Sequence, residues 1–208
     1  MKKKIFFSLA CIISIVGLGI TISLHTNATP SYESTLAKWG QYLSSSQYDM
    51  KTYVTGENIR LVSSDVKQAQ EFFLLNGMSD DAALQEAILY MAEREVLYLQ
   101  AIEAGYEVSD AEVDAYLQEL KALIAVADNK EDAQIIISQF GSEDEYWDYQ
   151  FKVYKKNLPI QRFVAELEND FMKSNQQLDV AERESAWLEY FESYKQELVE
   201  AENLSIVQ

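Results

Sequence analysis

The sequence predicts an all-α fold, mainly helical, with a minor short β hairpin or terminal strand pairing. After residue 64, apolar side chains recur at three- and four-residue spacing, which is the period of an amphipathic helix. Short β-prone runs flank Gly56 and close the chain. With 48% hydrophobic and 12% aromatic residues, there is enough apolar surface for one core. We therefore expect a single helical domain over residues 51–208.

Residues 1–28 have the pattern of an export segment. Three lysines at positions 2 to 4 precede an uncharged, mostly apolar run from Ile5 to Leu24, and small residues end at Ala28. This run is longer than a signal-peptide core of about 7 to 15 residues and matches the about 20 that span a bilayer. A cleaved signal peptide and a membrane-retained signal anchor both stay open. Either one predicts an extracytoplasmic domain, membrane-anchored or secreted.

The single cysteine and the single histidine both fall in this leader. Cys11 lies early in the apolar run, whereas a lipidated cysteine should close it, so we reject a lipoprotein. Without residues 1–28 the domain has no thiol for a disulfide and no His25 for catalysis or metal binding. We therefore expect no catalytic residue, no metal and no cofactor.

The chain is strongly acidic. Removing the leader takes away three lysines and no acid, which changes the formal net charge from −17 to −20. This balance argues against a nucleic-acid partner, which would need clustered Lys and Arg. Two interpretations remain: acidity that keeps an exported protein soluble, and attraction to basic, unfolded polypeptides.

The first elements after the leader are short. Residues 29–50 are interpreted as a connector with some helix, because Leu36, Trp39 and Leu43 share a face. Gly56 then lies between two β-prone runs, which predicts a small hairpin. A helix from about Asp65 to Leu75 follows, and Gly77 is placed to end it in the left-handed conformation.

The middle of the chain predicts two further helices. Ser79 is placed to cap the first, and Gly105 to end it. Ser109 and Glu112 form a capping box for the second. Glu95 interrupts the apolar stripe of the first helix, and we expect it to reach solvent or to pair with a base such as Lys121.

A long aromatic-rich helix is expected from Glu143 to about Lys173, after a second capping box at 142–145. Pro159 should kink or break it. A last helix from about Val180 to Ala201 carries a packing stripe at helical spacing, formed by Trp187, Tyr190, Phe191, Tyr194 and Leu198. The run 204–207 could pair as a strand with residues 53–55.

These elements resemble the N-terminal chaperone domain of the SurA and PrsA extracytoplasmic foldases. Val54, Gly56 and Ile59 match the Val-x-Gly-x-x-Ile pattern, and residues 103–114 read Glu-Ala-Gly-Tyr-Glu-Val-Ser-Asp-Ala-Glu-Val-Asp. The resemblance covers about Tyr53 to Phe171 and, loosely, the last helix. The parvulin isomerase domain of those foldases would lie between the last two helices, where this chain has only about residues 172–183. The resemblance thus implies peptide binding without isomerase activity.

The expected function is that of a chaperone-like module, not an enzyme, which holds unfolded or exported polypeptides in an aromatic-lined, acidic-rimmed groove. The alternative is a dedicated assembly protein for one exported partner. The N-terminal segment would contact the membrane if it is uncleaved. For each candidate binding residue, packing in the core is the competing interpretation; the candidates are Tyr146, Trp147, Tyr149, Tyr154 and Phe163.

Overall fold

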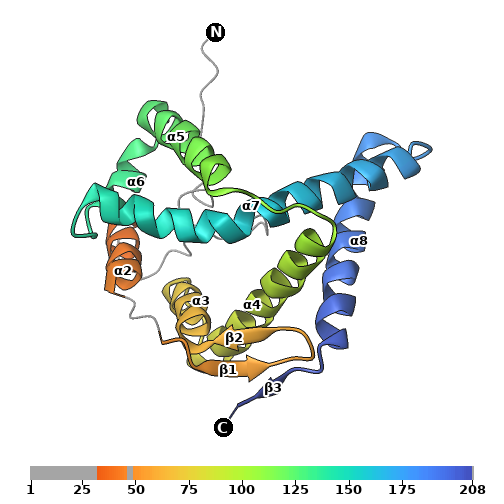
Figure 1. The fold of residues 1–208 in the computed structure, drawn as a ribbon, viewed down its shortest axis with the longest axis horizontal. Coiled ribbons are helices and arrows are strands. Elements are labelled where there is room, and N and C mark those ends of the chain that lie inside the picture. The colour runs from red at the N-terminus through yellow and green to blue at the C-terminus, as the bar shows by residue number, and fades with distance from the viewer. Residues whose placement is uncertain (1–31, 46–48, 208) are drawn as a thin grey trace.

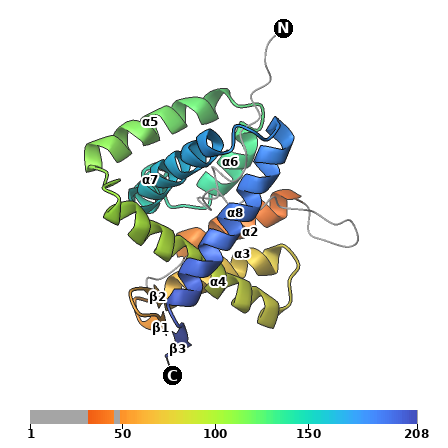
Figure 2. The ribbon, with the colours of Figure 1, turned by 90° about the vertical axis from the view of Figure 1, so that its right-hand side faces the viewer.

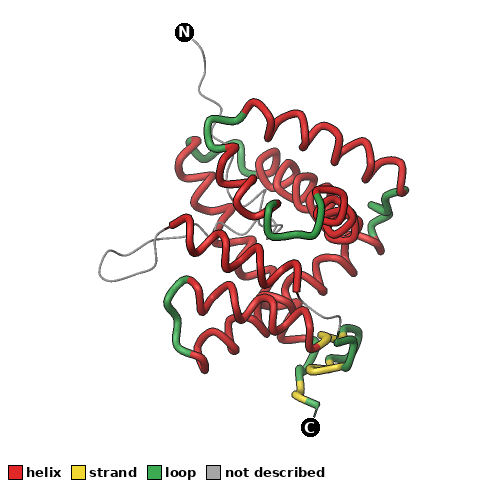
Figure 3. The backbone as a smooth tube through the Cα atoms, turned by 90° about the vertical axis from the view of Figure 1, so that its left-hand side faces the viewer, coloured by secondary structure: helices red, strands yellow, loops and turns green. Residues whose placement is uncertain are grey.

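The computed structural model describes residues 32–45 and 49–207, which are mainly helical (Figure 3). This confirms the predicted fold class. The strands occupy one corner beside the C-terminus. The helices are α2 (Tyr32–Ser45), α3 (Ser63–Leu75), α4 (Asp80–Glu103), α5 (Asp110–Val126), α6 (Lys130–Ile137), α7 (Glu143–Ser174) and α8 (Val180–Ala201). The strands are β1 (Thr52–Thr55), β2 (Arg60–Val62) and β3 (Ser205–Ile206).

The three strands form one antiparallel sheet with the order β2-β1-β3. The hairpin of β1 and β2 and the pairing of the C-terminal strand with β1 are both confirmed. Val54 lies opposite Ile206, and Thr55 lies opposite Ser205. The sheet thus joins the C-terminal strand to the hairpin that follows α2.

Glu202 holds the hairpin turn from the C-terminal side. Its carboxylate is buried and accepts hydrogen bonds from the Asn58 backbone N–H (2.6 Å) and the Ile59 N–H (3.2 Å). A Cβ on Gly56 would lie 2.6 Å from Glu202 Oε2, so this close approach requires glycine. The Val54-x-Gly56-x-x-Ile59 pattern thus has a physical reason: two buried apolar side chains flank a glycine that admits a carboxylate.

Helix α2 is part of the core, which corrects the expectation of a connector over residues 29–50. Leu36, Trp39 and Leu43 share one face, as predicted, and are at most 4% exposed. The helix packs on α3 and α6. The Gly40 Cα lies so close to α6 that an added Cβ would be 2.9 Å from the Ile136 carbonyl oxygen. An amphipathic face of this size is stabilised by burial against other helices.

The helix boundaries follow local signals. Gly77 and Gly105 have φ of 90° and 86°, the left-handed values expected after α3 and α4. The capping box of Ser109 and Glu112 is confirmed. Ser79 occupies the N-cap of α4 without a side-chain cap hydrogen bond. Before α7 only half of the predicted box forms, because Ser142 accepts from the Glu145 amide while Glu145 accepts from the Gly141 amide.

Helix α7 continues through Pro159 as a single bent ribbon from Glu143 to Ser174 (Figure 1). The sequence left a kink and a break both open, and the helix is not broken at Pro159. Asn157, Leu158, Pro159 and Ile160 are all buried, so the neighbouring elements surround the site of the missing amide hydrogen. Tertiary packing outweighs the local cost of proline, which is about 3 kcal/mol in a helix interior.

The apolar side chains form two clusters. The main core is formed by helices α2 through α7 together with the sheet. Helix α7 lies between α5 and α4 (Figures 1 and 2). The second cluster lies between the far half of α7, α4 and α8, around Leu97, Ile160, Trp187 and Phe191. Figure 2 shows α8 in front, running from the end of α7 down to the sheet.

Consecutive polar residues of α4 bind both neighbouring helices where the two clusters meet. Glu93 pairs with Lys195 of α8 (3.0 Å), and Arg94 Nε donates to Asn157 Oδ1 of α7 (3.2 Å). Glu95 pairs with Lys156 of α7 (2.5 Å) rather than with Lys121. The expected partner was wrong because α7, and not α5, lies against this face of α4.

Candidate peptide-binding surface

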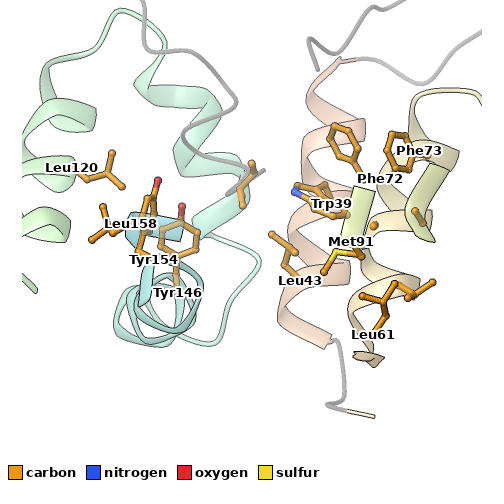
Figure 4. Close-up of a cluster of buried hydrophobic side chains, with 14 of the residues drawn as sticks. Trp39, Leu43, Leu61, Phe72, Phe73, Met91, Leu120, Tyr146, Tyr154 and Leu158 are labelled. Carbon is orange, nitrogen blue, oxygen red and sulfur yellow. The ribbon is translucent and has the colours of Figure 1, made fainter. Parts of the chain in front are cut away.

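The aromatic residues in the first half of α7 belong mostly to the core. Tyr146, Trp147 and Tyr154 are 1%, 6% and 2% exposed. Figure 4 shows Tyr146 and Tyr154 next to each other, with Leu158 and Leu120 of α5 on the Tyr154 side. These three candidates therefore pack inside the protein in this structure, which is the competing interpretation of core packing.

Trp147 is covered by a second layer of structure, helix α5, which packs against α7. The sequence predicted that its ring points well away from Tyr146, but the two rings meet edge-on at 5.0 Å between centroids. The Lys121 ammonium of α5 lies 4.6 Å from the Trp147 ring centroid. Its indole N–H donates to Glu143 Oε1 at 3.0 Å. Helix α7 has aromatic rings on two faces because it is packed on two faces.

The remaining two candidates are half-buried and lie in different places. Tyr149 packs against Phe140 (5.8 Å between ring centroids) and hydrogen-bonds Gln68 of α3. Phe163 belongs to the second cluster and meets Tyr106 edge-on at 6.2 Å. The structure thus does not bring the five candidates together as one surface.

A different set of rings reaches the surface where α7 and α8 pack together. We call it the aromatic ladder, and its members are Phe171, Trp187, Tyr190, Phe191 and Tyr194. Tyr190 stacks on Phe171 (5.0 Å) and on Tyr194 (6.1 Å). Trp187 stacks on Phe191 at 5.2 Å, and both are buried.

The outer members of the ladder are accessible. Tyr190 is 39% exposed, Phe171 and Tyr194 are half-buried, and the neighbouring Leu188 is 63% exposed. Helix α8 packs on α4 and α7, which cover the Trp187 and Phe191 side of it. The stacked rings therefore form an ordered apolar surface that stays open to solvent.

Acidic side chains surround this ladder. On α7 and α8 the exposed carboxylates near it are Glu166, Glu168, Asp170, Glu184, Glu189, Glu192 and Glu197. Lys173 at the end of α7 is paired with Asp170 at 3.1 Å. The surface thus combines aromatic faces with a negative field, which favours ligands that carry both apolar and basic side chains.

Tyr194 is a neutral group at ordinary pH. Burial raises the pKa of Tyr194, and the neighbouring Tyr190 and Glu103 raise it further. Its hydroxyl donates to Gln100 Oε1 of α4 at 3.4 Å. Tyr194 therefore offers an apolar ring face and a hydroxyl hydrogen bond rather than a reactive phenolate.

Within residues 32–45 and 49–207, no group of His, Cys, Asp and Glu is arranged to hold a metal ion. Cys11, His25 and the expected export segment 1–28 lie outside the described residues. Among the helices of the described ranges, none is long and apolar enough to cross a membrane.

Comparison with protein-family models, with curated proteins and with solved structures found no match to this chain. The resemblance to the foldase chaperone domain therefore stays a prediction.

The ladder was visible in the sequence but was interpreted as a packing stripe. Trp187 and Phe191 fulfil that interpretation, and Tyr190 does not. The available signal was the pair Tyr190 and Tyr194, since hydroxyl-bearing rings in an acidic helix suit a half-exposed position.

Proposed function

We propose that this chain is an extracytoplasmic chaperone-like protein that binds unfolded or extended polypeptides without isomerase activity. The observation that carries the proposal is the aromatic ladder, an ordered and partly exposed run of stacked rings within an acidic surface. Its ligand is a polypeptide segment in which apolar side chains alternate with Lys or Arg.

The physical basis is burial of client side chains against ring faces, at about 25 cal/mol per Å² of apolar surface. Ring faces accept many side chains, so the sequence preference is weak. The surrounding carboxylates and the π faces add attraction for cationic side chains. Such binding is modest and reversible, as a protein that holds and releases clients requires.

The ladder can be tested by its effect on aggregation. The double variant Leu188→Ser/Tyr190→Ser removes exposed apolar surface from α8 without opening the core. We expect the purified full-length chain to suppress aggregation of an unrelated unfolded protein, and this variant to lose most of that activity. The matched control is Leu123→Ser/Val126→Ser on α5, where the side chains are 44% and 68% exposed. It should retain the activity.

Three results would count against the proposal. Equal loss in both variants would show that general surface hydrophobicity, and not the ladder, binds the client. Absence of suppression by the unaltered chain, together with recovery of one stoichiometric complex from exported proteins, would favour a dedicated assembly protein. Turnover of a proline-containing peptide by the purified chain would contradict the absence of isomerase activity.

A further inference from the structure

The outer rings of the aromatic ladder keep part of their faces uncovered. Tyr190 lies between Phe171 and Tyr194, with ring planes inclined by only 27° and 20° and with centroids 5.0 and 6.1 Å apart. Two rings in full face contact would lie about 3.5 to 4 Å apart, so these nearly parallel rings do not cover one another completely. Tyr190 is 39% exposed. A planar group from outside the protein can therefore reach a ring face here.

The buried side of the ladder already holds a cation. The Lys195 ammonium lies 5.4 Å from the centroid of the Phe191 ring. It also pairs with the carboxylates of Glu93 (3.0 Å) and Glu192 (2.9 Å), and the lysine side chain is 3% exposed. An aromatic face and carboxylates together thus accommodate a positive charge that is almost fully buried. The same two kinds of group lie on the outer side of the ladder.

On the outer side the carboxylate is that of Glu103, at the end of α4, which lies beside α8 (Figure 1). Gln100 connects it to the ladder: Gln100 Oε1 accepts from the Tyr194 hydroxyl (3.4 Å), and Gln100 Nε2 donates to Glu103 Oε2 (3.4 Å). Burial, then Tyr190 and Glu103, raise the pKa of Tyr194, so the Glu103 charge lies close to this ring. Within the described residues, no cation pairs with Glu103 or lies over the rings of Phe171, Tyr190 and Tyr194.

Arginine suits this combination better than lysine. Its guanidinium is planar and can stack on a ring while its edge donates two hydrogen bonds to a carboxylate. The ammonium of lysine is compact and strongly hydrated, so it must give up water to contact a ring. An arginine side chain therefore matches a ring face and a neighbouring carboxylate at the same time.

We propose that the outer side of the aromatic ladder selects arginine over lysine in its polypeptide ligand, with the guanidinium stacked against Tyr190 and Tyr194 and hydrogen-bonded to the Glu103 carboxylate. The inference rests on the proposed function, since it names the side chain by which this surface holds its client. It needs no movement of the core, because Tyr190 and Glu103 are exposed and Tyr194 is half-buried. Apolar side chains of the client supply affinity, and arginine sets the preference among basic clients.

Two dye-labelled peptides of equal length test this selection, one of alternating leucine and arginine and one of alternating leucine and lysine. They carry the same net charge, so the general attraction to the acidic surface is the same for both. We expect the full-length chain to bind the arginine peptide with a Kd about threefold to tenfold lower, measured by fluorescence anisotropy.

Two variants locate the preference on the ladder. Tyr190→Leu keeps an apolar side chain and removes the π face, whereas Glu103→Gln keeps an acceptor for Gln100 and removes the charge. Each should reduce the ratio of the two Kd values to about twofold or less, with little change in melting temperature because both side chains are exposed. Glu119→Gln on α5 is the matched control, since it removes one exposed carboxylate from another helix. It should leave the ratio unchanged.

Equal Kd values for the two peptides in the unaltered chain overturn the selection of arginine and leave the proposed function standing. A preference that persists in both Tyr190→Leu and Glu103→Gln overturns its assignment to this surface. An equal fall of the ratio in Glu119→Gln overturns it too, because net charge would then set the preference. If the unaltered chain binds neither peptide, the proposed function fails, and this inference fails with it.

Discussion

The two halves of α7 are both rich in aromatic residues, yet their rings have different surroundings. In the first half Tyr146, Trp147 and Tyr154 are buried, and they contact α5 and Phe140 in the turn before α7. In the second half Phe171 meets α8, and its stacking partner Tyr190 is 39% exposed. The exposure of the rings differs because other elements cover the first half of α7 more fully than the second, and not because the two halves differ in composition. The lesson is that an aromatic stripe becomes a binding surface where the second layer is missing.

The two halves also differ in how they are held. The main core is a large apolar cluster, whereas the second cluster is small and is attached to α4 through Lys195 and Glu93. We therefore expect substitutions in the first half to change mainly stability and those at the ladder surface to change mainly binding.

Tyr146→Ala should have the largest effect. It removes a fully buried ring from the main core, and the expected loss is about 3 to 5 kcal/mol of unfolding free energy. Tyr190→Ala should cost about 1 kcal/mol or less, because that ring is partly exposed and gains mainly from stacking. Urea unfolding of both variants measures the contrast. Equal losses would break the comparison between the two halves.

Lys195→Met tests the attachment of α8. The ammonium is 3% exposed and pairs with Glu93, whose side chain is 12% exposed. Removing one partner of a buried pair costs about 3 to 5 kcal/mol, and we expect the lower end because Glu93 can take up a proton. The double variant Glu93→Gln/Lys195→Met should recover most of the loss. No recovery would show that packing of the Lys195 stem, and not its charge, holds the helix.

The pH dependence of Lys195→Met has a defined sign. Burial raises the pKa of Glu93 above its ordinary value of 4.5, although Lys195 opposes this, and losing the lysine raises the pKa further. A raised carboxyl pKa means that the folded state binds the proton more tightly. Its stabilising effect is fully present below pH 4.5 and is lost as the pH rises through the folded pKa. The penalty of Lys195→Met should therefore be larger at pH 8 than at pH 5.

Pro159→Ala concerns the junction of the two halves. Alanine restores an amide donor in the helix interior and removes a cost of about 3 kcal/mol. It also loses two buried methylene groups, at about 0.8 kcal/mol each. We expect a net gain of about 1 kcal/mol, seen as a higher melting temperature. A lower melting temperature would show that the bend at Pro159 is required by the packing around it.

Glu112→Gln should have the smallest effect, visible only in acid. Hydrogen bonds from the Ser109 backbone and hydroxyl, and then Arg162, lower the pKa of Glu112 from 4.5 to about 2. The contribution of this carboxylate is present above pH 4.5 and is lost as the pH falls toward 2. The unaltered chain should therefore lose more stability than the variant between pH 4.5 and 2. Parallel curves would contradict this.

Much of the fold could be predicted from local signals. Gly77, Gly105 and the Ser109 capping box mark helix ends through backbone conformation and short-range hydrogen bonds, which sequence displays directly. The sequence showed that α2 is amphipathic but not that it lies in the core. Its place there depends on the close approach of α6 to Gly40 of α2, which is a long-range contact.

The candidate site was harder to predict because the exposure of a side chain depends on which other elements pack against it. The sequence shows that Tyr154 and Tyr190 both lie on helices. It does not show that Tyr116 of α5 covers the first, at 4.9 Å between ring centroids, while Tyr190 stays 39% exposed. The partner of Glu95 was missed for the same reason, since Lys121 and Lys156 are equally available in the sequence.

The most direct test of the central claim is photo-crosslinking from the ladder. A benzoylphenylalanine placed at Leu188 of α8 would report contact with an unfolded client, and the same residue at Leu123 of α5 would serve as the control. The structure predicts abundant crosslinks from position 188 and few from position 123, although both side chains are exposed, at 63% and 44%. Equal crosslinking from the two positions would contradict the assignment of the aromatic ladder as the binding surface.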